Sequence, residues 1–227
     1  MKPKPKTATM PTDPAKPAIR GLYAIADRSY LADAAFEPAV RAALEGGARV
    51  VQYRDKQGGT AQREAIARVL NRLCQAQGVP FLVNDDVALA VAVGAAGVHI
   101  GRDDPHINAA RRALGKAAVI GVSCYDDLER ARQAQAAGAD YVAFGRFFPS
   151  RTKPRAVQAT TGLLQAARAE LHIPIVAIGG ITPDNGASLI EAGADALAVI
   201  EGLFNQPDIR AAAERYARLF SNESESP

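Results

Sequence analysis

The sequence predicts an α/β protein, a (β/α)8 TIM barrel in a single domain, and three observations lead to this prediction. The 227 residues lie within the size range of one such barrel. From residue 21 onward, short apolar β-like runs alternate with alanine-rich segments of helical spacing. Eight such runs can be counted, and eight βαβ units in a chain of this length fit a closed barrel better than an open sheet.

The eight predicted strands are short and rich in Val, Ile, Ala and Leu. In chain order they cover residues 21–27, 49–54, 80–84, 97–100, 118–123, 140–145, 174–180 and 196–200. Because a helical segment separates each strand from the next, we expect consecutive strands to pair in parallel. The carboxyl ends of the strands would then meet at one end of the barrel.

Helical spacing and a terminal glycine mark the segments between the strands. The clearest predicted helices cover residues 36–47, 61–78 and 127–138, and each stops at a Gly suited to a C-cap. A final helix at about residues 207–220 closes the series. These helices are expected to form the outer layer of the barrel.

The two ends of the chain are expected to lie outside the fold. Residues 1–18 are rich in Lys and Pro and lack apolar periodicity, which predicts a disordered extension. The barrel domain is predicted to cover residues 19–220, followed by a flexible tail at 221–227. The extension has no continuous apolar region of the secretory kind, and its prolines would break a transit helix, so a cytoplasmic location is expected.

Composition argues against several classes of function. A net charge of +3, an aromatic content of 6% and the absence of Trp give little basis for a nucleic-acid surface. No apolar run reaches the roughly 20 residues of a membrane span. Cys74 and Cys124 lack a C-x-x-C spacing, so neither a disulfide framework nor a zinc site is predicted. We expect small-molecule substrates, with no nucleic acid or membrane as partner, and a homo-oligomer stays open.

Polar residues follow the predicted strands, at the end of the barrel where such folds carry chemistry. Carboxylates and an amide follow the third and fourth strands, namely Asn84, Asp85, Asp103 and Asp104. Groups suited to phosphate lie near the ends of other strands: Gln52, Arg54, Lys56, Ser123, Ser150, Thr152, Lys153, Gly179 and Gly180. A metal-bound polyphosphate needs both kinds, because Mg²⁺ takes one or two carboxylates together with phosphate oxygens.

Each of these groups also has a purely structural interpretation. Asp103 or Asp104 before Pro105 fits an N-cap with proline at the first helical position. The acidic pair that begins at Asp85 could likewise cap the apolar helix that follows it. His99 is expected to be a strand residue packed at the edge of the barrel, and not a ligand or base. Function is favoured because independent caps would not place all their polar groups at one end of the barrel.

Six motifs follow one another along residues 21–220: GLYAIAD, VQYRDK, FLVNDD, GVHIGRDD, DYVAFGRFFPSRTKP and IPIVAIGGITPDN. In their order and spacing they resemble the motifs of the thiamine-phosphate synthase family. The resemblance implies a (β/α)8 transferase that couples a hydroxymethylpyrimidine pyrophosphate with a hydroxyethylthiazole phosphate, or its carboxylated form. The products would be thiamine phosphate and pyrophosphate, with Mg²⁺ as the cofactor.

The resemblance also implies roles for individual residues. The metal ligands would be Asp85 and Asp104. The pyrimidine pyrophosphate site would be lined by Gln52, Arg54, Lys56, Asn84, Ser123 and Lys153. The catalytic residues among these would be Arg54, Lys56, Ser123 and Lys153. The thiazole phosphate would be received by Ser150, Thr152, Gly180, Ile200 and Glu201.

Two positions depart from the family pattern. Arg102 stands where the family commonly has Gln, and Glu201 stands where a Ser commonly follows the eighth strand. A carboxylate beside a phosphate costs free energy unless it points away or pairs with a cation. At residue 201 we therefore expect only the backbone N–H to contribute to phosphate binding.

The residue types suit a reaction that needs no nucleophilic side chain. An electron-rich aminopyrimidine can stabilise a carbocation once pyrophosphate has left, and the thiazole nitrogen can then attack it. One alternative is a related barrel enzyme that isomerises a thiazole phosphate precursor, although it would not need Asp85, Asp104 or the pyrophosphate-binding cations. A second alternative is a non-catalytic sensor of phosphate ligands, for which Glu201 is the best supporting feature.

Overall fold

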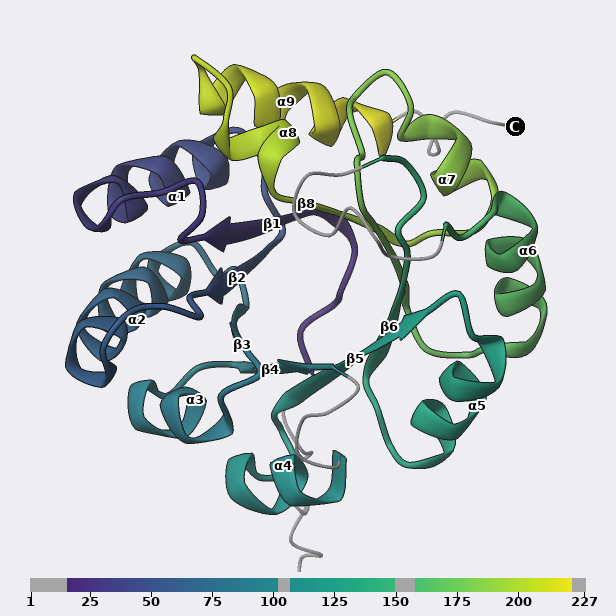
Figure 1. Cartoon of the computed structure of the whole chain (residues 1–227), viewed down its shortest axis with the longest axis horizontal. Coiled ribbons are helices and arrows are strands. Elements are labelled where there is room, and N and C mark those ends of the chain that lie inside the picture. The colour runs from purple at the N-terminus through teal and green to yellow at the C-terminus, as the bar shows by residue number, and fades with distance from the viewer. Residues whose placement is uncertain (1–15, 102–106, 150–157, 222–227) are drawn as a thin grey trace, which may run out of the picture.

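The computed structural model describes residues 16–101, 107–149 and 158–221. Within these ranges, eight parallel strands form a closed barrel in sequence order, surrounded by helices (Figure 1). The strands are β1 (Gly21–Asp27), β2 (Val50–Arg54), β3 (Phe81–Asn84), β4 (Gly97–Ile100), β5 (Val119–Tyr125), β6 (Tyr141–Phe144), β7 (Ile175–Ile178) and β8 (Ala196–Val199). The predicted single-domain (β/α)8 fold is confirmed.

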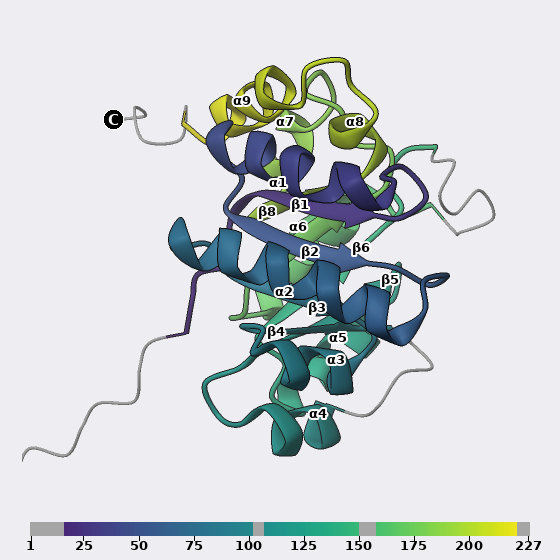
Figure 2. The ribbon, with the colours of Figure 1, turned by 90° about the vertical axis from the view of Figure 1, so that its left-hand side faces the viewer.

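The helices of the described residues form the outer layer, as a side view along the barrel wall shows (Figure 2). They are α1 (Phe36–Glu45), α2 (Thr60–Ala76), α3 (Val87–Val93), α4 (Ile107–Leu114), α5 (Leu128–Ala136), α6 (Thr161–Glu170), α7 (Ala187–Glu191), α8 (Glu201–Phe204) and α9 (Ile209–Leu219), with a 3-10 turn at Asp33–Ala35. The predicted helices 36–47, 61–78, 127–138 and 207–220 correspond to α1, α2, α5 and α9. Most of the predicted extension and tail, residues 1–15 and 222–227, lies outside the described residues.

Alternation along each strand divides the core into two regions. Successive side chains of a strand point to opposite faces, so Leu22 and Ala24 pack outward against the helices. Tyr23 and Ile25 instead belong to a separate buried cluster with Val176 and other inward residues of the barrel. The inside of the barrel is therefore filled with side chains, and the space left for a ligand lies toward its carboxyl end.

Both cysteines, Cys74 and Cys124, are buried and free. Burial raises the pKa of the Cys74 and Cys124 thiols to about 12. Thiols that stay protonated at neutral pH are poor nucleophiles. In the part of the chain that the structure describes, no helix combines the length and the apolar character needed to cross a membrane.

The glycine at residue 97 allows β4 to pair closely with β5. Gly97 is the register partner of Val119, and a Cβ atom at residue 97 would lie 1.8 Å from the Val119 carbonyl oxygen. We expect Gly97→Ala to lower the free energy of unfolding by about 1–3 kcal/mol or more, because the ladder would have to separate there. Urea unfolding measures this change.

The matched control is Gly162→Ala in α6, where the nearest atom to the added Cβ would be Thr160 Oγ1 at 3.7 Å. This change is expected to raise the free energy of unfolding by about 0.5–1 kcal/mol, since alanine favours the helix. A Gly97→Ala protein as stable as the wild type would contradict the close pairing of β4 and β5.

Candidate functional site

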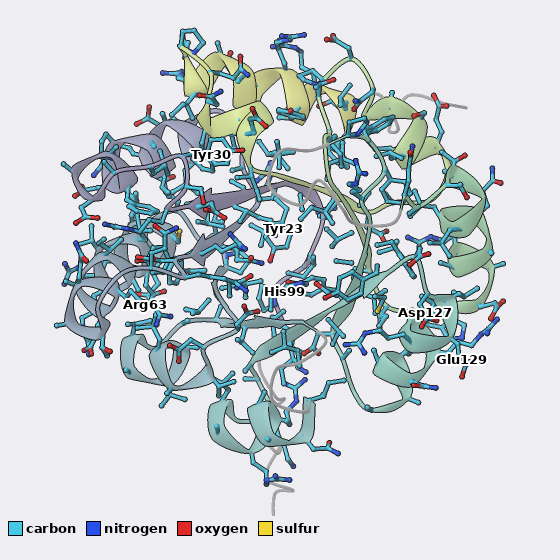
Figure 3. The ribbon with its side chains drawn as sticks, viewed as in Figure 1. Tyr23, Tyr30, Arg63, His99, Asp127 and Glu129 are labelled. Carbon is cyan, nitrogen blue, oxygen red and sulfur yellow. The ribbon has the colours of Figure 1, made fainter. Side chains whose placement is uncertain are left out.

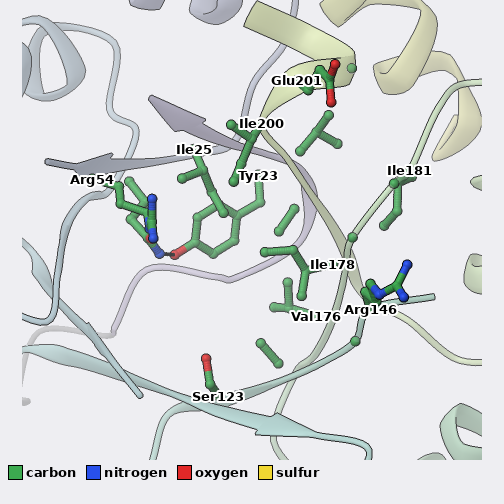
Figure 4. Close-up of a pocket in the computed structure, with 18 of the residues that line it drawn as sticks. Tyr23, Ile25, Arg54, Ser123, Arg146, Val176, Ile178, Ile181, Ile200 and Glu201 are labelled. Carbon is green, nitrogen blue, oxygen red and sulfur yellow. Dashed lines mark hydrogen bonds between the residues drawn. The ribbon is translucent and has the colours of Figure 1, made fainter. Parts of the chain in front are cut away.

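A cavity of about 390 Å³ opens at the carboxyl end of the barrel, a size typical of small-molecule sites. Much of its wall is apolar and comes from β1, β6, β7 and β8, with Ile25, Ala143, Val176, Ile178 and Ala198. Arg54 and Arg146 lie on opposite sides of it, with Ser123 and Glu201 at two further positions on its wall (Figure 4). The arrangement provides an apolar space bordered by cations and hydrogen-bonding groups.

The structure brings most of the described site residues together. The cavity is lined by Gln52, Arg54, Asn84, Ser123, Gly180, Ile200 and Glu201. Lys56 and Asp85 border a neighbouring hollow that shares Asn84 with the cavity. The remaining predicted site residues lie outside the described residues: Asp104, Ser150, Thr152 and Lys153.

Arg54 is held at the rim of the cavity by a carboxylate that the sequence analysis missed. Asp27 at the end of β1 is the register partner of Arg54 at the end of β2, and the two side chains form an ion pair. Asp27 is 1% exposed and also accepts a hydrogen bond from the Ser29 N–H at 2.8 Å. Because Asp27 is fixed on two sides, it holds the Arg54 guanidinium in one place. Its position directly at a predicted strand end was the signal available in the sequence.

The two acids after β3 have different roles in the structure. Asp86 caps α3, since its carboxylate accepts the Leu89 N–H at 2.8 Å, and it also accepts a hydrogen bond from Arg63 Nη2 at 2.9 Å. Asp85 has a left-handed backbone with φ of 63°, a conformation that Asp and Asn tolerate better than most residues. Its carboxylate Oδ2 lies 2.9 Å from Lys56 Nζ. Local capping therefore accounts for Asp86 and not for Asp85.

A chain of hydrogen bonds crosses the inside of the barrel along the wall of the cavity. Gln52 Nε2 donates to Tyr23 Oη at 2.6 Å, and Tyr23 Oη lies 2.8 Å from Tyr141 Oη. His99 Nδ1 lies 2.9 Å from Tyr141 Oη, and His99 Nε2 lies 2.8 Å from Ser123 Oγ. Burial raises the pKa of Tyr23 and Tyr141 above the usual range, so both phenols keep their protons at neutral pH.

The expectation for His99 was therefore wrong in its placement. Its side chain does not pack at the edge of the barrel but lies inside it with Tyr23 (Figure 3), and it lines the cavity. A strand of four residues, Gly97–Ile100, is too short for its pattern to reveal which face points inward. Its placement depends on the register with Gly121 of β5 and on the hydrogen bonds to Ser123 and Tyr141 from the next two strands.

The two glycines after β7 make room for the loop that follows β6. A Cβ atom at Gly179 would lie 2.4 Å from Arg146 Cβ, and one at Gly180 would lie 2.4 Å from the Pro149 carbonyl oxygen. Both glycines also have positive φ, 104° and 64°. Close packing between the two loops is thus sufficient to explain why residues 179 and 180 are both glycine. It brings Arg146, a cation that the sequence analysis did not single out, to the wall of the cavity.

Glu201 begins α8 and borders the cavity. The Tyr30 hydroxyl donates to Glu201 Oε2 at 3.3 Å. The carboxylate is therefore held in part by the segment that follows β1. Its side chain faces the same space as Ile200, whose backbone was expected to contribute to anion binding.

Asp55 organises the loop that carries Arg54 and Lys56. Its side chain is fully buried, and its Oδ1 accepts the backbone N–H groups of Gln57 and Gly58 at 2.9 and 2.8 Å. Its Oδ2 accepts the Tyr53 hydroxyl at 3.0 Å. Burial by itself would raise the pKa of Asp55, but these hydrogen bonds outweigh it and hold the pKa below its ordinary value.

Comparisons with known proteins agree on one family. A family model described as thiamine monophosphate synthase matches residues 22–203. A thiamine-phosphate synthase of Nitrosococcus oceani is 54% identical over 89% of this chain and 94% of its own length. One of Thiobacillus denitrificans is 56% identical over 82% of this chain and 88% of its own. The solved thiamine phosphate pyrophosphorylase of Pyrococcus furiosus superposes with a TM-score of 0.80, at 35% identity over 89% of this chain and 96% of that chain.

The lowered pKa of Asp55 gives a prediction for stability against pH. Its carboxylate stabilises the fold above the unfolded pKa of about 3.9, and this stabilisation is lost as the pH falls through the lower folded pKa. We expect Asp55→Asn to cost about 1–3 kcal/mol at neutral pH, because an amide cannot accept all three hydrogen bonds. The difference in the free energy of unfolding between Asp55→Asn and the wild type should become smaller below about pH 4, as measured by urea unfolding.

Asp184→Asn is the matched control, because the Asp184 side chain is 83% exposed and pairs only at the surface with Arg215. Its effect should stay within about 0.5 kcal/mol. An Asp55→Asn protein whose stability differed from wild type by the same amount at every pH would contradict the role of the ionised carboxylate.

Proposed function

This chain belongs to the thiamine monophosphate synthase family of transferases, and from that premise we propose a magnesium-dependent coupling of two heterocycles. It joins hydroxymethylpyrimidine pyrophosphate to hydroxyethylthiazole phosphate, or its carboxylated form, and forms thiamine phosphate and pyrophosphate. The observation that supports this reaction best is one cavity with apolar walls whose rim gathers the amide, guanidinium and hydroxyl groups of Gln52, Arg54 and Ser123.

The end of β3 carries a donor set that suits Mg²⁺. Asp85 and Asn84 offer carboxylate and amide oxygens, the ligands this ion prefers, and Asp104 would be the second carboxylate. Asp85 already faces a cation, because Lys56 Nζ lies 2.9 Å from its Oδ2. Bound Mg²⁺ would offset the negative charge that grows on pyrophosphate as it leaves. Lys56, whose side chain is 58% exposed, is free to turn toward a phosphate oxygen.

The residues of the chain would promote departure of pyrophosphate by charge and by position. Arg54, held by Asp27, would donate charge-assisted hydrogen bonds to phosphate oxygens together with Lys56 and Lys153. Gln52 and Ser123 would orient the pyrimidine pyrophosphate through hydrogen bonds. The apolar wall formed by Ile25 and its neighbours would exclude water that could trap the pyrimidine cation.

The second substrate would lie on the side of the cavity formed by β7 and β8. Gly180 and Ile200 border this side, where their backbone would bind the phosphate, and Ser150 and Thr152 would add hydroxyl donors. Such a position holds the thiazole nitrogen in line with the pyrimidine methylene carbon. A cytoplasmic location and a homo-oligomer stay predictions.

The decisive experiment is an assay of purified protein with both heterocyclic phosphates and Mg²⁺. Thiamine phosphate and pyrophosphate should appear in equal amounts. Chelation of the metal should stop the reaction, and added Mg²⁺ should restore it. Isomerisation of the carboxylated thiazole phosphate without coupling would favour the isomerase alternative, and ligand binding without any product would favour the sensor.

Asp85→Asn tests the metal assignment, because asparagine tolerates the left-handed backbone at this position but lacks the negative charge. We expect kcat to fall by about 10²–10³-fold and the Mg²⁺ concentration for half-maximal activity to rise. Steady-state kinetics across a Mg²⁺ titration measure both quantities.

The matched control is the neighbouring Asp86→Asn. Asparagine caps a helix as well as aspartate, so only the ion pair with Arg63 is lost. Its kcat should stay within about a factor of ten of the wild type. Equal losses in the two variants would show that the metal assignment is wrong.

A further inference from the structure

We infer that the hydrogen-bond chain inside the barrel fixes the tautomer of His99 and thereby makes Ser123 a donor toward the cavity. The chain runs through Gln52, Tyr23, Tyr141, His99 and Ser123. Tyr23, Tyr141 and His99 also line the cavity, and the role that we assign to them here is to position Ser123. What Ser123 contacts rests on the proposed function, whereas the direction of the chain rests on the orientation of the Gln52 amide toward Tyr23.

The chain is built into the barrel and shielded from water. Tyr23 is 1% exposed, Tyr141 is fully buried and His99 is 9% exposed. The His99 and Tyr141 rings stack with centroids 5.6 Å apart. Gly121 makes room for this arrangement, since a Cβ atom there would lie 1.9 Å from Tyr141 Cζ. Because water has little access, each polar group must find its partner within the chain or in the cavity.

The direction of donation follows from the first bond. Gln52 Nε2 donates to Tyr23 Oη at 2.6 Å, so the Tyr23 proton is available for Tyr141 Oη at 2.8 Å. Tyr141 then donates to His99 Nδ1 at 2.9 Å, which requires that this nitrogen carry no proton. Neutral His99 therefore holds its proton on Nε2 and donates it to Ser123 Oγ at 2.8 Å.

The opposite direction leaves a buried proton without a partner. If His99 Nδ1 donated to Tyr141, then Tyr141 would donate to Tyr23, which already accepts from Gln52. The proton of Tyr23 would then have no acceptor among the hydrogen bonds of the described residues, in a side chain that is 1% exposed. An unmade buried hydrogen bond costs about 1–3 kcal/mol. The orientation of the Gln52 amide thus sets the direction of the whole chain.

Ser123 lies at the end of the hydrogen-bond chain and lines the cavity. Because its oxygen accepts a proton from His99, its own proton is left to donate to an acceptor in the cavity. The pyrimidine pyrophosphate presents such acceptors, its phosphate oxygens and ring nitrogens. With the reverse direction, Ser123 would donate to His99 and offer the same substrate only lone pairs, which phosphate repels.

The first measurement is the tautomer of His99 in the wild-type protein. Long-range ¹H–¹⁵N correlation spectra distinguish the two neutral tautomers, and the protein has only three histidines. The signal lost in His99→Asn identifies the residue. We expect His99 to carry its proton on Nε2, and a proton on Nδ1 would overturn the inference.

The second experiment uses Gln52→Glu to reverse the direction of donation along the hydrogen-bond chain. An ionised carboxylate can only accept, so Tyr23 would donate to it and the direction would run from Ser123 toward residue 52. Spectra recorded from about pH 6 to 10, a range that covers a raised carboxyl pKa, should show the His99 proton moving to Nδ1, with kcat reduced at least about tenfold. A His99 proton that stays on Nε2 throughout this range would also overturn the inference.

Tyr141→Phe and Tyr216→Phe form a matched pair of buried tyrosines. The Tyr216 hydroxyl is buried and donates to the Ile181 carbonyl at 2.8 Å, outside the chain. Both variants should lose similar stability, but only Tyr141→Phe should alter the His99 signal and lower kcat, by about tenfold with KM less affected. An unchanged His99 signal in Tyr141→Phe would contradict the inference that Tyr141 donates to His99. Failure of the proposed function would be distinguished from failure of this inference, because the wild-type protein would then form no thiamine phosphate.

Discussion

Pairing between β1 and β8 closes the sheet, and the site exists only because of this closure. Gly21 pairs with Ala196 and Ala24 pairs with Val199, while the other edge of β1 pairs with β2. A closed ring of parallel strands brings all the carboxyl ends around one space. Residues 118 positions apart, such as Tyr23 and Tyr141, then touch across the inside of the barrel. An open sheet of the same strands would spread the same polar groups along an edge.

Closure also decides which polar groups are permitted inside. A barrel interior of this size has little water, so a buried hydroxyl or amide is tolerated only when its hydrogen bonds are satisfied. The chain from Gln52 to Ser123 satisfies this condition link by link. A partly satisfied chain would be worse than an apolar core, because each unmet group costs about 1–3 kcal/mol. The chain therefore stabilises one arrangement of protons as well as one arrangement of side chains.

The sequence predicted the features that depend on local patterns. The eight strands were recognisable because each apolar run is short and is followed by a helical segment, and the capping role of Asp86 depends only on residues within its own turn. The pairing of Asp27 with Arg54 and the inward direction of His99 could not be predicted in the same way. They depend on register between strands, which places residues 27 or more positions apart in contact. Register follows from closure of the whole sheet, and no single strand encodes it.

Two cations near the cavity are paired with carboxylates, and the two ion pairs differ in their exposure to solvent. The Arg54 side chain is 18% exposed and the Asp27 side chain is 2% exposed, so their ion pair is shielded from solvent, and breaking it would leave an uncompensated buried charge. The pair between Lys56 and Asp85 is more open, with side chains 58% and 27% exposed, and costs less to separate. In the proposed reaction, Arg54 would therefore meet the pyrophosphate without losing Asp27, whereas Lys56 would have to release Asp85. On the same proposal, this release would free the Asp85 carboxylate for Mg²⁺ and the Lys56 cation for a phosphate oxygen. The proposed binding of Mg²⁺ and of pyrophosphate would thus be coupled through the exposed pair of Lys56 and Asp85, while the buried pair of Arg54 and Asp27 would keep the geometry of the site unchanged.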